Sequence, residues 1–202
     1  MTRFRLLRDG DDLGEFRLPL LGAHNVRNAL AGIAVGVEAG VDLERLREGL
    51  AAFEGVKRRL EVVGVRRGVT VYDDFAHHPT AVAETLAALR AAAPGRRLWA
   101  VFEPRSASSC RRVFQQDFAA AFGGADRVVI ASVFRSSLPD HERLSEAQLV
   151  SDLTAAGVTA SHEPDVETIV RRVAAEAVSG DLVVLMSNGG FDGIHQRLLE
   201  AL

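Results

Sequence analysis

The chain has 202 residues, of which 48% are hydrophobic, and its formal net charge at pH 7 is −3. This apolar content is enough for one large core or two modest ones. A near-neutral charge, with arginines interleaved among acids, argues against a binder of nucleic acid or of anionic membranes. The single cysteine, Cys110, excludes an intrachain disulfide and a cysteine-based metal site, which fits a reducing compartment.

No apolar run approaches the ~20 residues that a membrane-spanning helix needs. The first residues, MTRFRLLRDGDD, carry acids directly after a short apolar stretch and lack the apolar core of a signal peptide. We therefore expect a cytoplasmic protein with no membrane partner.

Residues 1–57 have the pattern of a strand pair followed by a helix pair. Two short alternating strands flank the turn-rich segment RDGDDLG, and helical spacing then runs from Asn25 to Gly40. Asp42 is a suitable N-cap for a second helix. The inner faces of the two helices are predicted to carry Val26, Leu30, Ile33 and Val37, and then Leu43, Leu46 and Leu50. This segment is small for an independent core.

From Arg59 onward the pattern changes to alternating strands and helices. The predicted strands are residues 60–65, 69–74, 97–102, 126–132, 158–162 and 181–187, and the predicted helices are residues 79–93, 108–122, 145–157, 165–178 and the C-terminal segment. Pro79 suits the first position of its helix, and Ser145 with Gln148 forms a capping-box signature. The fold class predicted is α/β, a Rossmann-like, mostly parallel sheet with helices on both faces.

Parallel sheets bind ligands at the carboxyl ends of their strands. Four segments follow predicted strands at that edge: DDFAHHP (73–79), EPRSASS (103–109), SVFRSS (132–137) and SNGGFDGIH (187–195). Three of them are rich in polar, charged or glycine residues. The topology is therefore expected to collect these groups at one edge of the sheet.

Asp73 and Asp74 end a strand, so their side chains are expected to point to opposite sides. A carboxylate facing the ligand crevice would suit Mg²⁺, a ribose hydroxyl or an ammonium group. The alternative is that one of the two acids caps the helix beginning at Pro79. The sequence leaves both interpretations open.

His77 and His78 are adjacent, which is poor spacing for two ligands of one metal ion, and no metal-binding residue is predicted. Beside a helix N-terminus, the two imidazoles suit a carboxylate or phosphate partner. The other interpretation is that one histidine is merely a neighbour of the helix cap.

Arg105 follows a buried strand directly after Pro104, a placement that suits bidentate binding of a carboxylate. The glycine-rich segment SNGGFDGIH either offers backbone N–H groups to an anion or makes a tight turn with positive φ. The sequence contains no GxxxxGK[ST] and no GxSxG motif. The residues by themselves thus predict an α/β domain that binds a small anionic or zwitterionic ligand.

Three segments resemble motifs of the Mur ligase family, the ATP-dependent amide-forming enzymes of bacterial cell-wall synthesis. GAHNVRNALAGIAVGVEAG (22–40) is similar to the HNxxNxxAA segment that closes the central ATP-binding domain. FEGVKRRLEVV (53–63) resembles the F-x-G-V-x-x-R-x-E stretch at the junction with the C-terminal domain. YDDFAHHPTAV (72–82) resembles the DDYxHHPT signature of members that add the first residue to the muramic acid lactyl group.

Two members of the family compete on these motifs. One ligates L-alanine to UDP-N-acetylmuramate, and the other ligates the murein tripeptide L-alanyl-γ-D-glutamyl-meso-diaminopimelate. VFEPRS (101–106), MSNGGFDGIH (186–195) and the DDF in place of DDY resemble the tripeptide-adding member, which we therefore favour. That resemblance implies a ligase of peptidoglycan recycling, with UDP-N-acetylmuramate and the tripeptide as substrates.

The resemblance also implies roles for individual residues. His24, Asn25 and Asn28 would approach the adenine and ribose of ATP. Arg59 would meet the nucleotide, and Asp74 would contact its ribose or γ-phosphate region. The catalytic residues implied are Asp74 and His77. The residues that would hold the incoming amino acid or peptide are His77, His78 and Arg105, with Ser187, Asn188 and Phe191 closing round it. A second substrate arginine is not at the family's usual spacing, and Arg111 and Arg112 remain as candidates.

On this resemblance, residues 1–57 are the end of the central ATP-binding domain and residues 58–202 are the C-terminal domain. The family's P-loop, its Mg²⁺ ligands and its UDP-sugar domain lie upstream of these segments. We therefore expect ATP and Mg²⁺ to be bound mainly outside this chain, and the chain by itself to be inactive. A non-catalytic binding module is the alternative from a different class.

Overall fold

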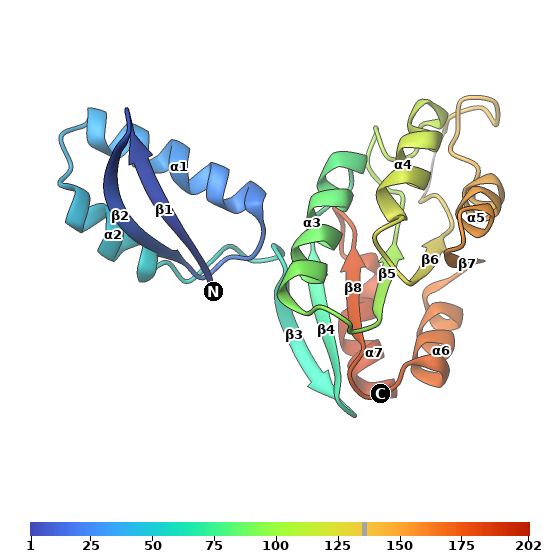
Figure 1. The fold of residues 1–202 in the computed structure, drawn as a ribbon. Coiled ribbons are helices and arrows are strands. Elements are labelled where there is room, and N and C mark those ends of the chain that lie inside the picture. The colour runs from blue at the N-terminus through green and yellow to red at the C-terminus, as the bar shows by residue number, and fades with distance from the viewer. Residues whose placement is uncertain (135–136) are drawn as a thin grey trace. The chain divides into compact units, whose positions relative to one another are not determined.

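The computed structural model describes residues 1–134 and 137–202 of the chain. The chain divides into two compact units, Met1–Lys57 and Arg58–Leu202 (Figure 1). The division falls where the spacing of apolar residues changes in the sequence. The assignment of the first unit to an ATP-binding domain stays a prediction.

The first unit is a two-stranded sheet with two helices. Strands β1 (Thr2–Arg8) and β2 (Asp11–Leu18) pair antiparallel, and α1 (Ala23–Glu38) and α2 (Leu43–Ala51) follow. Its small core contains buried Leu6, Phe16 and Ile33, with Phe4, Leu13, Val37, Leu43, Leu46 and Leu50 packed against them. As predicted, Asp42 caps α2, because its carboxylate accepts from Glu44 N at 2.9 Å.

The inner face of α1 differs from the prediction at one position. Leu30 is 46% exposed, whereas the neighbouring Ala29 is 7% exposed and belongs to the buried face with Ile33. A period of 3.6 residues permits either neighbour four or three residues before Ile33 to face inward. The prediction that Leu30 faces inward is therefore wrong by one residue, since Ala29 takes that place.

The second unit is built on a six-stranded sheet. Its strands are β3 (Glu61–Arg66), β4 (Val69–Asp74), β5 (Leu98–Phe102), β6 (Arg127–Ala131), β7 (Thr159–Glu163) and β8 (Leu182–Met186), in the spatial order β3-β4-β8-β5-β6-β7. Within this sheet, the described residues pair antiparallel between β3 and β4 and parallel at the other strand pairs. The predicted α/β class with a mostly parallel sheet is confirmed.

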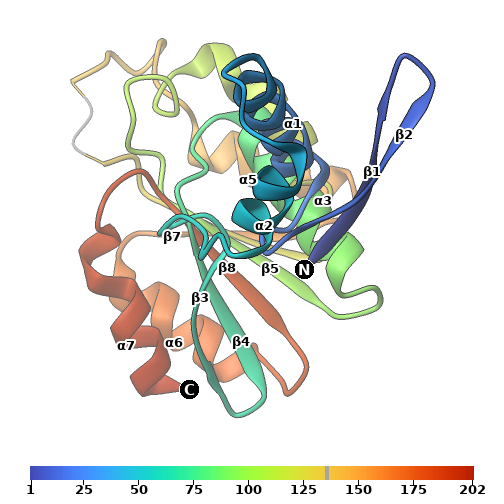
Figure 2. The same ribbon diagram turned by 90° about the vertical axis from the view of Figure 1, so that its left-hand side faces the viewer.

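Helices cover both faces of this sheet (Figures 1 and 2). Helices α3 (Pro79–Ala92), α4 (Gln115–Phe122) and α5 (Glu146–Ala155) pack on one face, and α6 (Val166–Glu176) and α7 (Ile194–Ala201) pack on the other. Alternate residues of the apolar strands supply the two cores. Phe102 on β5 packs on Phe118 and Phe122 at ring-centroid distances of 5.1 and 5.3 Å, whereas Trp99 of the same strand faces α6 and α7.

One predicted helix start differs in the structure, and one is confirmed with an incomplete capping box. The helix expected from residue 108 begins with a short 3₁₀ turn, η1 (Arg112–Phe114), because Ser109 Oγ accepts from the N–H groups of Arg105 and Ser106 and holds a turn there. The capping box at Ser145 is half formed. Ser145 Oγ accepts from Gln148 N at 3.2 Å, but the Gln148 side chain donates to Asp152 instead of returning to Ser145.

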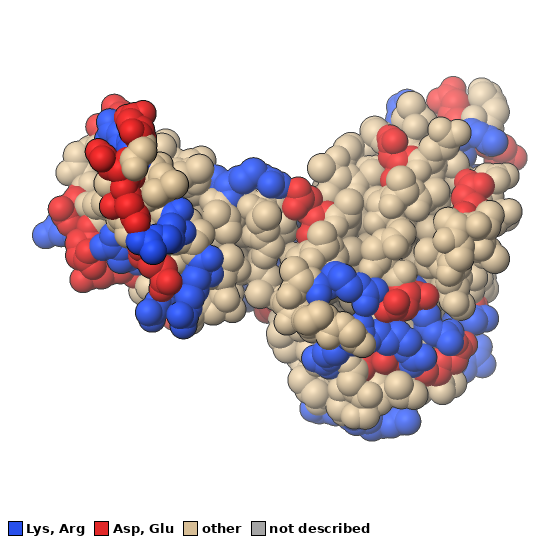
Figure 3. Space-filling view, viewed as in Figure 1, with Lys and Arg blue, Asp and Glu red and all other residues tan. Residues whose placement is uncertain are grey.

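Charged side chains of both signs lie next to one another on the face of each unit that Figure 3 presents. This mixed surface agrees with the near-neutral composition. Within the described residues, none of the helices has the length and apolar character required to cross a membrane.

An ion pair between half-buried Arg97 and the buried carboxylate of Asp181 holds the end of the sheet opposite the carboxyl edge. Asp181 is 2% exposed, and its carboxylate accepts from Arg97 Nη2 at 2.6 Å, from the indole Nε1 of Trp99 at 2.9 Å and from Val178 N at 3.0 Å. Burial acts to raise the pKa of Asp181, but the bonds from Arg97, Val178 and Trp99 hold that pKa below its ordinary value. The carboxylate thus joins the start of β5 to the start of β8.

We expect Asp181→Asn to lower the free energy of unfolding by about 2 to 4 kcal/mol at pH 7, because it leaves Arg97 without its buried partner. Since the native pKa is depressed, the contribution of the carboxylate is present above the unfolded pKa and is lost as the pH falls. The difference from the wild type should therefore shrink below about pH 4.

Urea unfolding followed by the fluorescence of Trp99, the chain's single tryptophan, measures this effect in the second unit. Asp140→Asn is the matched control, because Asp140 is 90% exposed in its pair with Arg143. Its effect should stay within about 0.5 kcal/mol. Equal effects of the two substitutions would contradict the stabilising role of Asp181.

Candidate functional site

The carboxyl ends of β4, β8 and β5 lie side by side, as the topology predicts. Asp74 and Phe102 both pair in register with Met186. Backbone bonds continue beyond the strands, from Ser187 N to Asp74 O at 3.2 Å and from Glu103 N to Met186 O at 3.0 Å. The loops that begin with Phe75, Glu103 and Ser187 therefore leave the sheet together.

The carboxylate of Asp74 faces the interior and not the ligand crevice. Asp74 is 3% exposed, its Oδ1 accepts from Ala76 N at 2.8 Å and from Thr85 Oγ1 at 3.2 Å, and its Oδ2 accepts from Leu60 N at 2.8 Å. Burial raises the pKa of Asp74, although these bonds and Arg59 act to lower it. The expected contact between Asp74 and a nucleotide has no support in this geometry, because its oxygens shape the loop between β4 and α3. That contact stays a prediction. The interpretation of either acid as a cap is wrong, since His78 is the N-cap of α3 and no side chain caps it.

Asp73 points to the other side, as the alternation predicts. Its carboxylate contacts Arg58 Nε at 3.1 Å and His195 Nε2 at 3.0 Å. Burial acts to raise the pKa of Asp73, but His195 and Arg58 together hold it below its ordinary value. Arg58 Nη2 also donates to the carbonyl oxygens of Ser187 and Gly189 at 2.6 and 2.7 Å. Arg58 thus joins the β4 edge to the loop after β8.

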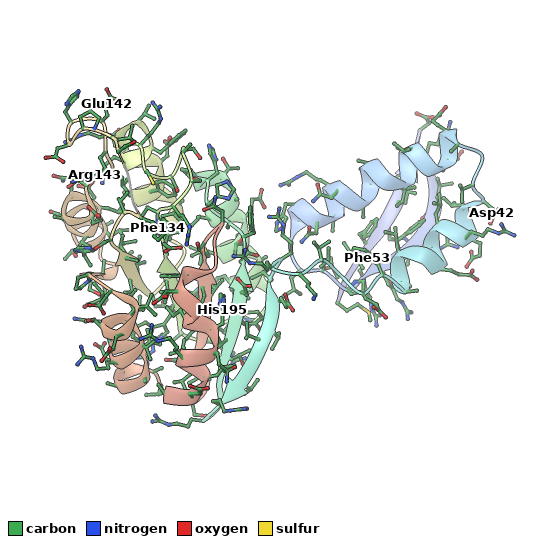
Figure 4. All side chains as sticks on the ribbon, turned by 180° about the vertical axis from the view of Figure 1, so that it is seen from behind. Asp42, Phe53, Phe134, Glu142, Arg143 and His195 are labelled. Carbon is green, nitrogen blue, oxygen red and sulfur yellow. The ribbon has the colours of Figure 1, made fainter. Side chains whose placement is uncertain are left out.

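Sequence reasoning gave no role to Arg58 or His195. His195 lies at the start of α7, where Figure 4 labels it beside the strands. Their positions in the sequence were suggestive, because Arg58 precedes the first strand of its unit and His195 ends the glycine-rich segment at the ligand edge. The residues around either position do not, however, predict a contact with Asp73.

His77 and His78 occupy different surroundings. His77 Nδ1 lies 2.9 Å from the carbonyl oxygen of Phe75, and its ring meets the Phe75 ring edge-on at 5.3 Å. Because a carbonyl oxygen only accepts, Nδ1 carries the proton, and in the neutral imidazole Nε2 is left as an acceptor. His78 is exposed and its ring lies 5.0 Å from that of Phe114. The guanidinium groups of Arg58 and Arg59 lie 5.1 and 5.8 Å from the Phe75 ring centroid.

Arg105 is held beside the loop after β8. Its guanidinium carbon lies 3.6 Å from the centroid of the Phe134 ring, and its Nη1 is 3.5 Å from Glu103 Oε2. Figure 4 labels Phe134 in the segment that follows β6. Glu103 is 7% exposed in its side chain and accepts a 2.6 Å bond from Ser187 Oγ. The sequence analysis missed Glu103, although an acid directly after five apolar strand residues was a usable signal.

The residues after β8 differ in their surroundings. Ser187 is 2% exposed, and its hydroxyl accepts from Gly189 N at 2.9 Å. The Asn188 Oδ1 atom is buried and has no hydrogen-bond partner among the described residues. Phe191 is 1% exposed and packs in the core with Ile194, and its expected contact with a substrate stays a prediction. The glycines Gly189 and Gly190 do not have positive φ, whereas Phe191 and Asp192 do, at 46° and 48°.

The remaining predicted residues are placed as follows. His24, Asn25 and Asn28 lie in the first turns of α1, where Asn28 Nδ2 donates to Asn25 Oδ1 at 3.4 Å. Arg59 is exposed in the second unit. Arg135 and Ser136 of the SVFRSS segment lie outside the described residues.

The two candidates for a second substrate arginine, Arg111 and Arg112, are exposed. Their backbones anchor a neighbouring loop, because Arg111 bridges Arg143 and Arg112 N donates to Glu142 O at 2.7 Å. Figure 4 labels Glu142 and Arg143 in that loop. In the part of the chain that the structure covers, histidine, cysteine and acidic side chains do not gather in threes as the ligands of a metal ion would.

Comparisons with known proteins show the family of the chain. Residues 58–189 match the family described as Mur ligase, glutamate ligase domain. The chain is 40% identical over 203 residues to UDP-N-acetylmuramate–L-alanyl-gamma-D-glutamyl-meso-2,6-diaminoheptandioate ligase of Escherichia coli (strain K12), an alignment that covers 100% of this chain and 42% of the relative. It is 38% identical over 195 residues to UDP-N-acetylmuramate–L-alanine ligase of Desulfitobacterium hafniense (strain Y51), covering 96% of this chain and 43% of the relative.

A solved structure of a Mur ligase is also similar to this chain. The murein peptide ligase of Psychrobacter arcticus 273-4 superposes with a TM-score of 0.71 at 35% identity, covering 93% of this chain and 38% of that one. The chain thus spans less than half the length of these relatives. The match of the family over most of the second unit, together with the identity to these ligases, shows that the chain belongs to the Mur ligase family.

Proposed function

We propose that the full-length protein carrying this chain is an ATP-dependent ligase that joins a murein tripeptide to UDP-N-acetylmuramate, and that this chain supplies the part that binds the incoming peptide. The observation that carries the proposal is the placement of Arg105. A guanidinium held against Phe134 stands at the sheet edge where parallel α/β folds bind ligands. A peptide carboxylate is the natural partner of its donor fork.

The proposal also specifies the acceptor, which is the tripeptide and not L-alanine. Relatives of both kinds are similar to the chain, at 40% and 38% identity, so overall similarity does not separate the tripeptide from L-alanine. Support for the tripeptide comes from the segments VFEPRS and MSNGGFDGIH. In the structure these two segments meet, through Ser187 Oγ and Glu103 Oε2 at 2.6 Å.

Side chains of this chain fit parts of a nucleotide. Asn25 and Asn28, adjacent in the first turns of α1 beside His24, offer amide groups of the kind that bind a base edge or a ribose. Arg59, exposed near Phe75, suits a phosphate. When bound, ATP supplies the phosphoryl group that activates the lactyl carboxyl group. We assign Mg²⁺ mainly to the part of the protein outside this chain.

Residues of the second unit would orient the acceptor and receive its proton. Arg105 binds a peptide carboxylate, with His78 and Asn188 beside the peptide. As the amide bond forms, the attacking amine loses a proton, and the acceptor Nε2 of neutral His77 is suited to receive it. Asp74 has a positioning role, since its bonds to Leu60 and Ala76 fix the loop that presents His77.

Phosphate release by the full-length protein tests the activity. With ATP, Mg²⁺ and UDP-N-acetylmuramate present, we expect release when the tripeptide is added and none with L-alanine. Release with L-alanine alone would identify an alanine-adding ligase. A protein that lacks a P-loop and releases no phosphate with either acceptor would be a binding module. The 202-residue chain by itself is the negative control, and its turnover is expected to be absent.

Arg105→Ala should raise KM for the tripeptide between about 10- and 100-fold, the loss of charge-assisted hydrogen bonds worth about 1.5 to 3 kcal/mol. KM for ATP and for UDP-N-acetylmuramate should not change. Arg105→Lys should fall between, because an ammonium lacks the planar fork. Arg143→Ala, which removes an arginine paired with exposed Asp140, is the control. A uniform rise in all three KM values after Arg105→Ala would argue against a carboxylate contact.

A further inference from the structure

We propose that Gly189 and Phe134 are positioning residues for Arg105, and that position 189 requires glycine because of the Arg105 side chain and not because of the backbone. The inference rests on the proposed function, in which Arg105 binds the carboxylate of the incoming peptide. It adds two residues, on the loops after β8 and β6, that fix the direction of the guanidinium.

The space beside Gly189 is filled by Arg105. A Cβ atom built on Gly189 would lie 2.4 Å from both Cδ and Nε of Arg105, and 2.6 Å from its Cζ. These separations are far below van der Waals contact. The φ of Gly189 lies outside the left-handed region, so its backbone conformation admits an alanine. The close approach of Arg105 is what excludes a side chain.

The loop that carries Gly189 is fixed at its backbone. Gly189 N donates to Ser187 Oγ at 2.9 Å, and Gly189 O accepts from Arg58 Nη2 at 2.7 Å. Arg58 in turn is paired with Asp73. A methyl group added at position 189 would therefore be accommodated by displacement of Arg105, because retreat of the loop would break both bonds.

Arg105 cannot move without losing its other contacts. The face of its guanidinium packs on the Phe134 ring at 3.6 Å, and Phe134 N is bound to Pro104 O at 2.9 Å. Glu103 Oε2 lies 3.5 Å from Nη1. The stacked ring occupies a face of the guanidinium and leaves its N–H edges directed in the plane, the geometry that a carboxylate needs.

Holding the guanidinium in advance has a consequence for binding. A free arginine side chain loses rotamer freedom when it binds a carboxylate, and a pre-positioned one loses less. The contacts with Gly189 and Phe134 should therefore act on affinity for the peptide and leave the other two substrates unaffected.

Gly189→Ala in the full-length ligase should raise KM for the tripeptide between about 10- and 100-fold, with KM for ATP and UDP-N-acetylmuramate unchanged. The matched control is Gly190→Ala. Gly190 has a φ of −78°, and a Cβ there meets no atom within 4 Å, so its kinetics should match the wild type. Equal effects of the two substitutions, or a rise in all three KM values, would overturn the proposal.

A double-substitution cycle separates positioning from loop damage. In the Arg105→Ala background, Gly189→Ala should cause no further rise in KM for the tripeptide, because the side chain through which it acts is already absent. Independent, multiplying effects would overturn the proposal.

A spectroscopic measurement tests the same contact without activity. The Nε–Hε signal of Arg105, assigned by its loss in Arg105→Lys, should carry a ring-current shift from Phe134 in the 202-residue chain. The shift should be lost in Phe134→Leu and in Gly189→Ala and kept in Gly190→Ala. Retention of the shift in Gly189→Ala would refute the positioning role. If the wild type releases no phosphate with either acceptor while this pattern holds, the ligase assignment fails and the positioning role stands.

Discussion

The ion pair between Asp73 and Arg58 is the contact on which the arrangement of the ligand edge depends. The guanidinium of Arg58 also binds the carbonyl oxygens of Ser187 and Gly189, and His195 contacts the other oxygen of Asp73. One half-buried cluster of polar side chains therefore joins the end of β4, the loop after β8 and the start of α7. Because removal of one partner would leave the other half-buried without compensation, the cluster tolerates little change. The loops at this edge are held by polar contacts at their backbones, in addition to the burial of Ala76 and Phe191 in the apolar cores.

Much of the fold could be predicted from the sequence, because its strands are continuous apolar runs and its helices have clear spacing. β5 and β8 are buried on both faces, and the pattern of a parallel sheet follows from that alone. The predictions that failed concern segments whose local sequence is compatible with two conformations or two buried faces. Ala29 and Leu30 both fit the inner face of α1, and only the packing of the unit selects Ala29. The hydroxyl of Ser109 competes with helix formation, which no count of apolar residues reveals.

The candidate site could be located but not assembled from the sequence. The topology rule places Asp73, Asp74, Arg105 and the glycine-rich segment at one edge, and the structure brings them there. The contacts of Arg58 and Glu103, however, join residues far apart in the chain, so no spacing rule reveals them. For the same reason, the inward direction of Asp74 and the burial of Phe191 become apparent only in three dimensions.

The last strand of the sheet in sequence lies at its centre. β8 pairs with β4 on one side and with β5 on the other. The backbone hydrogen bonds of β4 and β5 on these sides therefore form only after residues 182–186 are present. During synthesis on the ribosome, the two halves of the sheet therefore expose apolar edges until residues 182–186 have been made. A product cut short by a premature stop codon would keep those edges open, and such edges are prone to aggregation and need chaperones. Completion of this one strand thus separates a folded second unit from a target of cellular quality control.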